Sequence, residues 1–326
     1  MTRKKDGTNA VMDDTEEDVV TRIAWLYYKE KMTQAEIADR ISLSRQKVQR
    51  LLEKARDLEI IRFTLKHPYV NLLSVESRLK EELGLRDAVV VPAASADVDH
   101  LRASMAKAGA EYLERRLSTE RSCILGLGWG NTTAHLADFF DGQSITGKIE
   151  VVSLIGNLMM NVSMNPYIMG DRIANKLDAP FYNIWAPAIA QTKERAEAFR
   201  SEPWIKDVLD KGCKANVNLL PIGELSRAAS LFKMGYLSAA DLKRLGDKGA
   251  VGDILSQFFD AEGEIIDDEV HNRVIGVPLE TLRAGKKINI GVAGGASKVK
   301  AIKAAAAQGY INVLITDEKT AVAVLR

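Results

Sequence analysis

Apolar residues recur with helical spacing over residues 33–58, in two short segments separated by a polar turn. Thr33 precedes the first segment, and Glu36 follows Thr33 by three residues, which is the spacing of a capping box. Ser44 stands before the second segment as another candidate N-cap. The apolar stripe of that segment consists of Val48, Leu51, Leu52, Ala55 and Leu58. The pattern predicts two helices joined by a tight turn.

The polar face of the second predicted helix carries side chains that can bind the edges of DNA bases. Arginine and glutamine make paired hydrogen bonds to bases in the major groove, and the start of a recognition helix is the part that meets them. Residues 44–66 carry a net charge of +4, which attracts the phosphate backbone. These features favour a helix-turn-helix over an ordinary solvated helical hairpin. The predicted DNA-binding residues are Ser44, Arg45, Gln46, Lys47, Gln49, Arg50 and Lys54.

The helix-turn-helix pattern ends in a short apolar run and a proline. Residues 60–65 read as a strand that can form one arm of a wing. Pro68 then interrupts the pattern, because proline disfavours a helical conformation in the residue before it. We therefore expect a winged-type DNA-binding domain over residues 1–66, disordered up to about Val11, and a second domain over residues 67–326.

The second domain alternates short β-branched runs with helical stretches of ten or more residues. This alternation predicts an α/β fold with a mainly parallel, doubly wound sheet. A helix over 72–83, closed by Gly84, has an apolar spacing that suits a linker, an oligomerisation element or a cover for the sheet. The predicted strands are 88–91, 123–127, 150–155, 181–185, 216–220, 288–292 and 311–316.

Two glycine-rich turns join predicted strands to predicted helices, and such sheets bind ligands beyond the carboxyl ends of their strands. The first, residues 126–133, places Thr132 and Thr133 at a helix N-terminus, a natural anion site, although it can equally be a tight corner. The second, residues 294–298, brings together backbone N–H groups, the Ser297 hydroxyl and the Lys298 ammonium. That combination suits a phosphate or sugar hydroxyls, against the alternative of a plain N-cap with an exposed lysine.

A third candidate lies in the glycine-flanked stretch 249–260. Asp253 can cap a helix that follows it, or its carboxylate can face a pocket and accept hydrogen bonds from ligand hydroxyls. Both interpretations fit the spacing. If the Asp253 carboxylate faces a pocket, it and the two glycine-rich turns together predict a small polar or phosphorylated ligand.

Composition narrows the class of protein only slightly. The chain has 326 residues, 46% of them hydrophobic and 27% charged, as in ordinary globular proteins. A net charge of +1 means that any affinity for nucleic acid comes from a local patch. Cys123 and Cys213 lie in apolar, strand-like segments and read as small buried hydrophobes, and the four histidines show no metal-ligand spacing. The chain has no apolar stretch of about 20 residues and no apolar core of a signal peptide, so we expect a cytoplasmic protein. We also expect that the protein has no cofactor.

Several long motifs resemble those of the SorC/DeoR-type sugar-responsive bacterial transcription regulators. The segment SRQKVQRLLEKARDLEIIRF resembles the recognition helix and following strand of that family. GLGWGNTT, GAVGDILSQFFDAEG, INIGVAGGASKVKAIKAA and GYINVLITDEKTA resemble the signatures of its effector domain. The resemblance extends from about Asp13 to the C-terminus.

The resemblance implies an effector domain similar to glucosamine-6-phosphate deaminase and related sugar-phosphate isomerases. It also implies a homotetramer that binds double-stranded operator DNA under the control of a small sugar, polyol or sugar phosphate. Two positions depart from the family pattern, since Ser42 and Glu59 stand where glycine is common and can loosen the local geometry. The residues that match the effector site are Gly128, Gly130, Asn131, Thr132, Asp253, Gly294, Gly295, Ser297 and Lys298.

The sequence thus predicts a regulator of a carbohydrate-catabolic operon rather than an enzyme. The alternative is a sugar-phosphate isomerase or deaminase with a helical extension, but no acid and histidine pair is recognisable beside Asp253. A DNA-binding scaffold with empty glycine turns is a third reading. Residues 156–163 contain no cation, so Lys298 is the one ammonium of these turns, and we expect a ligand with at most one phosphate.

Overall fold

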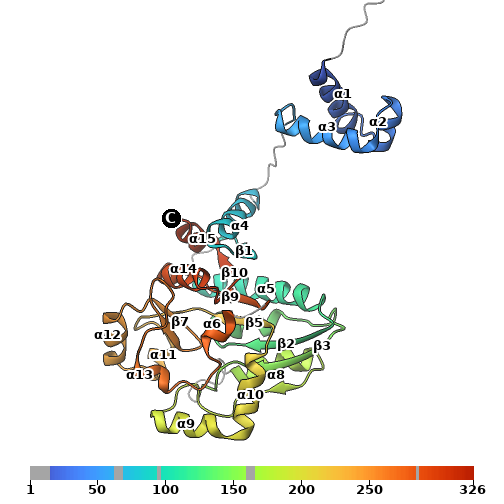
Figure 1. Ribbon diagram of the computed structural model, residues 1–326. Coiled ribbons are helices and arrows are strands. Elements are labelled where there is room, and N and C mark those ends of the chain that lie inside the picture. The colour runs from blue at the N-terminus through green and yellow to red at the C-terminus, as the bar shows by residue number, and fades with distance from the viewer. Residues whose placement is uncertain (1–14, 62–68, 94–96, 159–165, 284–285) are drawn as a thin grey trace, which may run out of the picture. The chain divides into compact units, whose positions relative to one another are not determined.

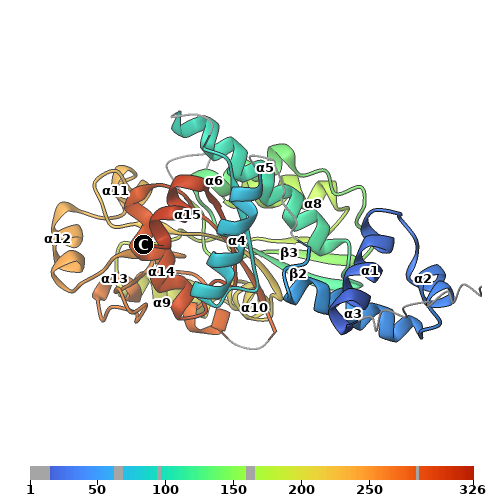
Figure 2. The same cartoon turned by 90° about the horizontal axis from the view of Figure 1, so that it is seen from above.

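The computed structural model describes residues 15–61, 69–93, 97–158, 166–283 and 286–326. Its contacts divide the chain into two units, Met1–His67 and Pro68–Arg326. Figures 1 and 2 show both units. The predicted disordered segment before Val11 lies outside the described residues.

The N-terminal unit contains three helices, α1 (Glu16–Tyr28), α2 (Gln34–Arg40) and α3 (Arg45–Asp57). The predicted caps are confirmed. The Thr33 N–H donates to Glu36 Oε2 at 2.7 Å, the Glu36 N–H donates to Thr33 Oγ1 at 3.3 Å, and Ser44 Oγ accepts the Lys47 N–H at 3.2 Å. The buried side chains of the three helices form one core of their own: Val20, Ile23, Ala24, Leu26, Ile37, Ala38, Val48, Leu51, Leu52 and Ala55.

Three details of this unit differ from the prediction. Leu58 lies beyond α3 as its C-cap and is 49% exposed, so it does not extend the buried stripe. Ile60 and Ile61 form a bend rather than the start of a strand, and the rest of the predicted wing lies outside the described residues. Ser42 and Glu59 adopt left-handed backbone conformations with φ of 55° and 53°, so the geometry that glycine favours is kept without glycine.

The second unit is built on a seven-stranded parallel sheet, which confirms the predicted doubly wound α/β fold. The strand order is β1-β10-β9-β5-β2-β3-β4. Adjacent side chains of one strand face opposite layers, as Leu314 and Ile315 do. The strands are β1 (Asp87–Val91), β2 (Ser122–Leu127), β3 (Lys148–Ser153), β4 (Phe181–Tyr182), β5 (Val217–Pro221), β9 (Ile288–Val292) and β10 (Val313–Asp317).

Helices cover both faces of this sheet, as Figure 2 shows for α5 and α8 on one side and α10 on the other. One face is covered by α5 (Val98–Leu117), α7 (Leu136–Phe139) and α8 (Pro166–Lys176). The opposite face is covered by α4 (Tyr69–Leu83), α10 (Pro203–Cys213), α14 (Val299–Ala307) and α15 (Glu318–Val324), with α9 (Lys193–Ser201) beside α10.

Two of these helices correspond to features that the sequence pointed to. The helix predicted over 72–83 packs on β1 and α15 with Leu72 and Leu79 buried, so it covers the sheet. Cys123 is buried in β2 as expected, but Cys213 ends α10 and does not lie in a strand.

A small lobe follows β5 and contains an antiparallel three-stranded sheet. Its strands are β6 (Gly223–Glu224), β7 (Gly252–Ile254) and β8 (Gln257–Phe259), and its helices are α11 (Ser230–Lys233), α12 (Ala239–Asp247) and α13 (Glu269–Asn272). Two 3-10 turns, η2 (Leu279–Arg283) and η3 (Ala296–Lys298), flank β9.

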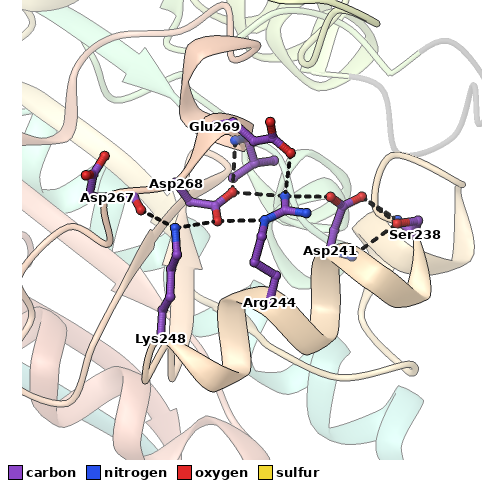
Figure 3. A network of polar contacts seen from close by, with 8 residues as sticks. Ser238, Asp241, Arg244, Lys248, Asp267, Asp268 and Glu269 are labelled. Atoms are coloured by element: carbon purple, nitrogen blue, oxygen red, sulfur yellow. Dashed lines mark hydrogen bonds and ion pairs between the residues drawn. The ribbon is translucent and has the colours of Figure 1, made fainter.

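An ion-pair network holds α12 against the start of α13 (Figure 3). The Asp268 side chain is fully buried and accepts hydrogen bonds from Arg244 Nε at 2.9 Å, Lys248 Nζ at 3.0 Å and the Val270 N–H at 3.0 Å. Burial alone would raise the pKa of Asp268, but these bonds together hold it well below its ordinary value. The network fixes the lobe that carries β7.

Candidate functional site

A cavity of about 480 Å³ opens at the carboxyl ends of β2, β5, β9 and β10. Its walls come from α5, from the loops after these strands, from the small lobe and from the start of α15. This is the place where a doubly wound sheet binds ligands, and the volume lies in the range of small-molecule sites.

Eight of the nine residues that the sequence assigned to the effector line this cavity. They come from turns that are far apart in the sequence: Gly130, Asn131, Thr132, Asp253, Gly294, Gly295, Ser297 and Lys298. Gly128 does not line it. A Cβ atom at Gly128 would lie 2.9 Å from side-chain atoms of Leu255 and Pro221, so this glycine is explained by close packing.

The first glycine-rich turn opens α6 (Asn131–Ala134), which is a single turn of helix. Thr133 is fully buried and its hydroxyl donates to the Gly130 carbonyl at 3.2 Å. The Asn131 amide donates to Ser230 Oγ of α11 at 3.1 Å, which connects this turn to the small lobe. The turn is therefore one wall of the cavity, and so short a helix makes only a weak anion site.

The second glycine-rich turn offers unpaired donors. Gly295 has a φ of +109°, and its N–H donates to Thr320 Oγ1 at 2.7 Å instead of remaining free. Within the described part of the chain, the N–H groups of Ala296 and Ser297 donate no hydrogen bond. These two N–H groups, the Ser297 hydroxyl and the Lys298 ammonium are the donors available to an anion.

Asp253 lies in β7 and not before a helix, so the helix-cap interpretation is wrong. A two-residue turn, Leu255-Ser256, joins β7 to β8, with positive φ at both positions. Asp253 Oδ2 accepts the Ser256 N–H at 3.1 Å, and Oδ1 lies over the bare Cα of Gly223. Burial raises the pKa of Asp253 to about 6, although the Ser256 bond and the charge of Lys298 oppose the shift.

Lys298 faces the same cavity without an ion-pair partner in the described part of the chain. Burial lowers the pKa of this lysine, while the charges of Glu224 and Asp253 counteract the shift. An ammonium and a carboxylate that are not neutralised by each other are suited to a ligand that carries both an anionic group and hydroxyl groups.

The sequence interpretation missed four charged residues of the cavity. Arg102 comes from the second turn of α5 and forms an ion pair with Asp99 at 2.7 Å, Glu224 comes from β6, Asp317 ends β10, and Lys319 comes from α15. Lys298 is therefore not the only cation at the site. None of the four lies in a glycine-rich turn, so no local signal marks them. Trp129, inside the first turn, also lines the cavity.

The predicted DNA-binding face of α3 is solvent-exposed. Arg45, Gln46 and Arg50 form no side-chain hydrogen bond or ion pair within the described residues, and Lys47 is also exposed. Two other candidates are engaged, since the Gln49 amide donates to Glu53 at 3.2 Å and Lys54 pairs with Glu16 at 2.7 Å. The opposite side of the helix packs in the core of the unit.

The described residues contain no group of three or more His, Cys, Asp or Glu side chains arranged to hold a metal ion. None of the described helices is both long and apolar enough to cross a bilayer.

The Sugar-bind family model, which describes a sugar-binding domain, matches residues 67–326. The transcriptional regulator LsrR of Escherichia coli strain K12 is 37% identical over 316 residues, which cover 95% of each chain. The chain therefore belongs to the family of transcriptional regulators with this sugar-binding domain. The second unit is thus a sugar-binding domain of the type found in transcriptional regulators.

Further members of the sugar-binding regulator family extend the comparison. The erythritol catabolism regulatory protein EryD of Brucella abortus is 30% identical over 96% of this chain and 98% of its own. The full-length sorbitol operon regulator SorC of Klebsiella pneumoniae is a structural match with a TM-score of 0.75 and 26% identity, covering 96% of this chain and all of SorC. These relatives are named regulators rather than enzymes, which supports sugar-responsive transcription regulation and not the isomerase alternative.

Proposed function

We propose that the chain binds operator DNA through α3 and that a small sugar, polyol or sugar phosphate in the cavity controls this binding. The observation that carries the proposal is the convergence of three distant turns on one cavity, where Lys298 and Asp253 face a common space. The anionic group of the ligand meets Lys298 and the N–H groups of η3, and its hydroxyls bond to Asp253.

The start of α3 supplies the proposed DNA contacts. Arg45, Gln46, Gln49 and Arg50 read bases in the major groove, while Ser44 and Lys47 contact phosphates. Lys54 is a weaker candidate, because a phosphate contact would have to replace its ion pair with Glu16. The proposed DNA-binding domain comprises residues 1–66, with the helix-turn-helix as its binding motif.

A packed route leads from the cavity to α4, the helix that follows the N-terminal unit in the sequence. α15 begins beside the second glycine-rich turn and packs against α4. α4 begins at Tyr69, directly after the N-terminal unit, and Glu76 anchors it by accepting the Val90 N–H of β1 at 2.8 Å. A ligand that shifts α15 would therefore act on α4. Couplings of this kind typically change affinity about 5–150-fold.

We propose a homotetramer built as a dimer of dimers, acting in the bacterial cytoplasm. Operators with two half-sites are bound by proteins with two-fold symmetry, and the tetramer itself is what the resemblance to the SorC/DeoR-type regulators implies. The likeness of the fold to sugar-phosphate isomerases belongs to the same proposal. Light scattering of the full chain tests the tetramer.

Thermal unfolding against a panel of sugars, polyols and their monophosphates tests the ligand site. A ligand at about 100 times its Kd stabilises the protein by about 2.7 kcal/mol. We expect that shift to disappear in Lys298→Ala and to persist in Lys300→Ala, whose side chain is exposed on α14 and does not line the cavity. An equal shift in Lys298→Ala would contradict the proposed site.

A further inference from the structure

A chain of hydrogen bonds ties the second glycine-rich turn to the first turn of α15. The Gly295 N–H donates to Thr320 Oγ1 at 2.7 Å, and the Thr320 hydroxyl donates to Asp317 Oδ2 at 2.5 Å. A hydroxyl has a single proton to donate, and the carboxylate accepts that hydrogen bond. The lone pairs of Thr320 Oγ1 are therefore available to the Gly295 N–H. The hydrogen bonds run in one direction, from Gly295 through Thr320 to Asp317. Asp317 and Thr320 are 4% and 2% exposed.

The two glycines of the turn make this arrangement possible. A Cβ atom at Gly294 would lie 2.5 Å from Asp317 Oδ2, so a side chain there would displace the carboxylate. Gly295 has a φ of +109°, a conformation that residues with side chains rarely adopt. Both glycines thus serve the contact between the turn and α15.

The Thr320 hydroxyl is not required to cap α15. Asp317 is the N-cap, and its Oδ1 accepts the Thr320 N–H at 3.0 Å. That bond uses the backbone of Thr320 and survives any change of its side chain. The interaction that depends on the hydroxyl is the one with Gly295.

We propose that Thr320 is a positioning residue for the effector site. Its hydroxyl, oriented by Asp317, holds the Gly295 peptide so that the N–H groups of Ala296 and Ser297 and the Lys298 ammonium bind one oxyanion of the ligand. This inference rests on the proposed function, because it assumes that the ligand anion occupies η3. It assigns to Thr320 a role in affinity beyond that of a packed side chain.

The test is a ³¹P NMR titration of the full-length protein with inorganic phosphate, a probe that contains only the oxyanion. Thr320→Val removes the hydroxyl with little change of shape. We expect about tenfold weaker phosphate binding, as for the loss of one well-placed hydrogen bond. Thr320→Ser keeps the hydroxyl, and we expect it to bind phosphate as the wild type does.

Control variants separate this inference from the proposed function. Weakened binding in Lys298→Ala together with unchanged binding in Thr320→Val overturns the positioning role and leaves the effector site intact. Unchanged binding in Lys298→Ala, or no saturable binding by the wild type, overturns the anion site and the inference with it. Equal losses in Thr320→Val and Thr320→Ser show that the hydroxyl is not responsible and also overturn the inference.

A second variant covers the case in which Thr320→Val does not fold. Asp317→Asn keeps an oxygen to cap α15, but it replaces the anionic acceptor that orients the Thr320 hydroxyl. We expect it to weaken phosphate binding as Thr320→Val does, and wild-type affinity in this variant contradicts the proposal. Thermal unfolding of each variant verifies that it is folded at the temperature of the titration.

Discussion

Asp253 of β7 and Lys298 of η3 face the same cavity from opposite parts of the chain's fold, the small lobe and the turn after β9, and within the described residues they form no ion pair. Burial in the cavity disfavours the charged form of both side chains. Such an arrangement is unfavourable in the free protein and becomes favourable when a ligand supplies the missing partners. It predicts that the site lowers the stability of the free protein.

We predict that Asp253→Asn stabilises the free protein at neutral pH. The pKa of Asp253 is raised to about 6, above the value in the unfolded chain, so its contribution to stability is present in acid and is lost as the pH rises through 6. Asparagine does not titrate. The variant should exceed the wild type by about 3 kcal/mol at pH 7.5 and lose this advantage toward pH 4.

Urea denaturation of both proteins across this pH range measures the difference. A difference in the free energy of unfolding that does not change with pH would show that Asp253 does not titrate as described. The same variant should bind the ligand more weakly, because a neutral amide is a poorer acceptor for hydroxyl groups than a carboxylate.

We expect Gly223→Ala to distort the wall of the cavity that the small lobe contributes. A Cβ atom at Gly223 would lie 1.8 Å from Asp253 Oδ1, so the carboxylate has to move. We expect a loss of about 1–3 kcal/mol in the free energy of unfolding and weaker ligand binding.

Gly246→Ala is the matched control for Gly223→Ala. It lies in α12 of the same lobe, where the nearest atom to a new Cβ is 3.7 Å away, and we expect no loss of stability. Equal effects of the two alanines in calorimetry and ligand titration would refute the role given to Gly223.

Removing Arg244 should destabilise the lobe strongly. Arg244→Met leaves the buried Asp268 carboxylate with Lys248 as its one cation, and breaking such a pair costs about 3 kcal/mol. Lys243→Met on the same helix removes an ion pair with Asp247 that is well exposed, which is worth less than about 1 kcal/mol. Comparable losses in chemical denaturation would contradict the assigned importance of Asp268.

The turn before α3 carries a conformational strain that glycine relieves. Ser42 has a φ of 55°, and a left-handed residue with a side chain costs about 1 kcal/mol relative to glycine. We expect Ser42→Gly to slow hydrogen exchange of the amides in α2 and α3. Ser42→Ala keeps the Cβ atom and should give no protection, so slower exchange in both variants would point to another cause.

The sequence was most informative where chemistry is local. The caps Thr33 and Ser44 and the glycine turn before Lys298 are short-range patterns, and the structure contains each of them. The seven strands were likewise marked by β-branched runs, although β4 has two residues instead of the five expected.

The sequence was least informative where conformation or proximity depends on tertiary structure. Leu255 and Ser256 form a two-residue hairpin turn that usually contains asparagine or glycine, so the hairpin was undetectable and Asp253 was open to a helix-cap interpretation. Arg102, Glu224 and Lys319 meet in the cavity only because α5, β6 and α15 pack around it. Thr320 of α15 also reaches the cavity only through this packing.

The most direct test of the account is operator affinity with and without the ligand. DNA selected from a random library by the wild-type protein is titrated with wild type, Arg50→Ala and Lys298→Ala, using fluorescence anisotropy. We expect Arg50→Ala to weaken binding by about 1–3 kcal/mol. The ligand found by thermal unfolding should change the affinity of the wild type about 5–150-fold and leave that of Lys298→Ala unchanged. An equal response of wild type and Lys298→Ala to the ligand would contradict control of DNA binding from this cavity.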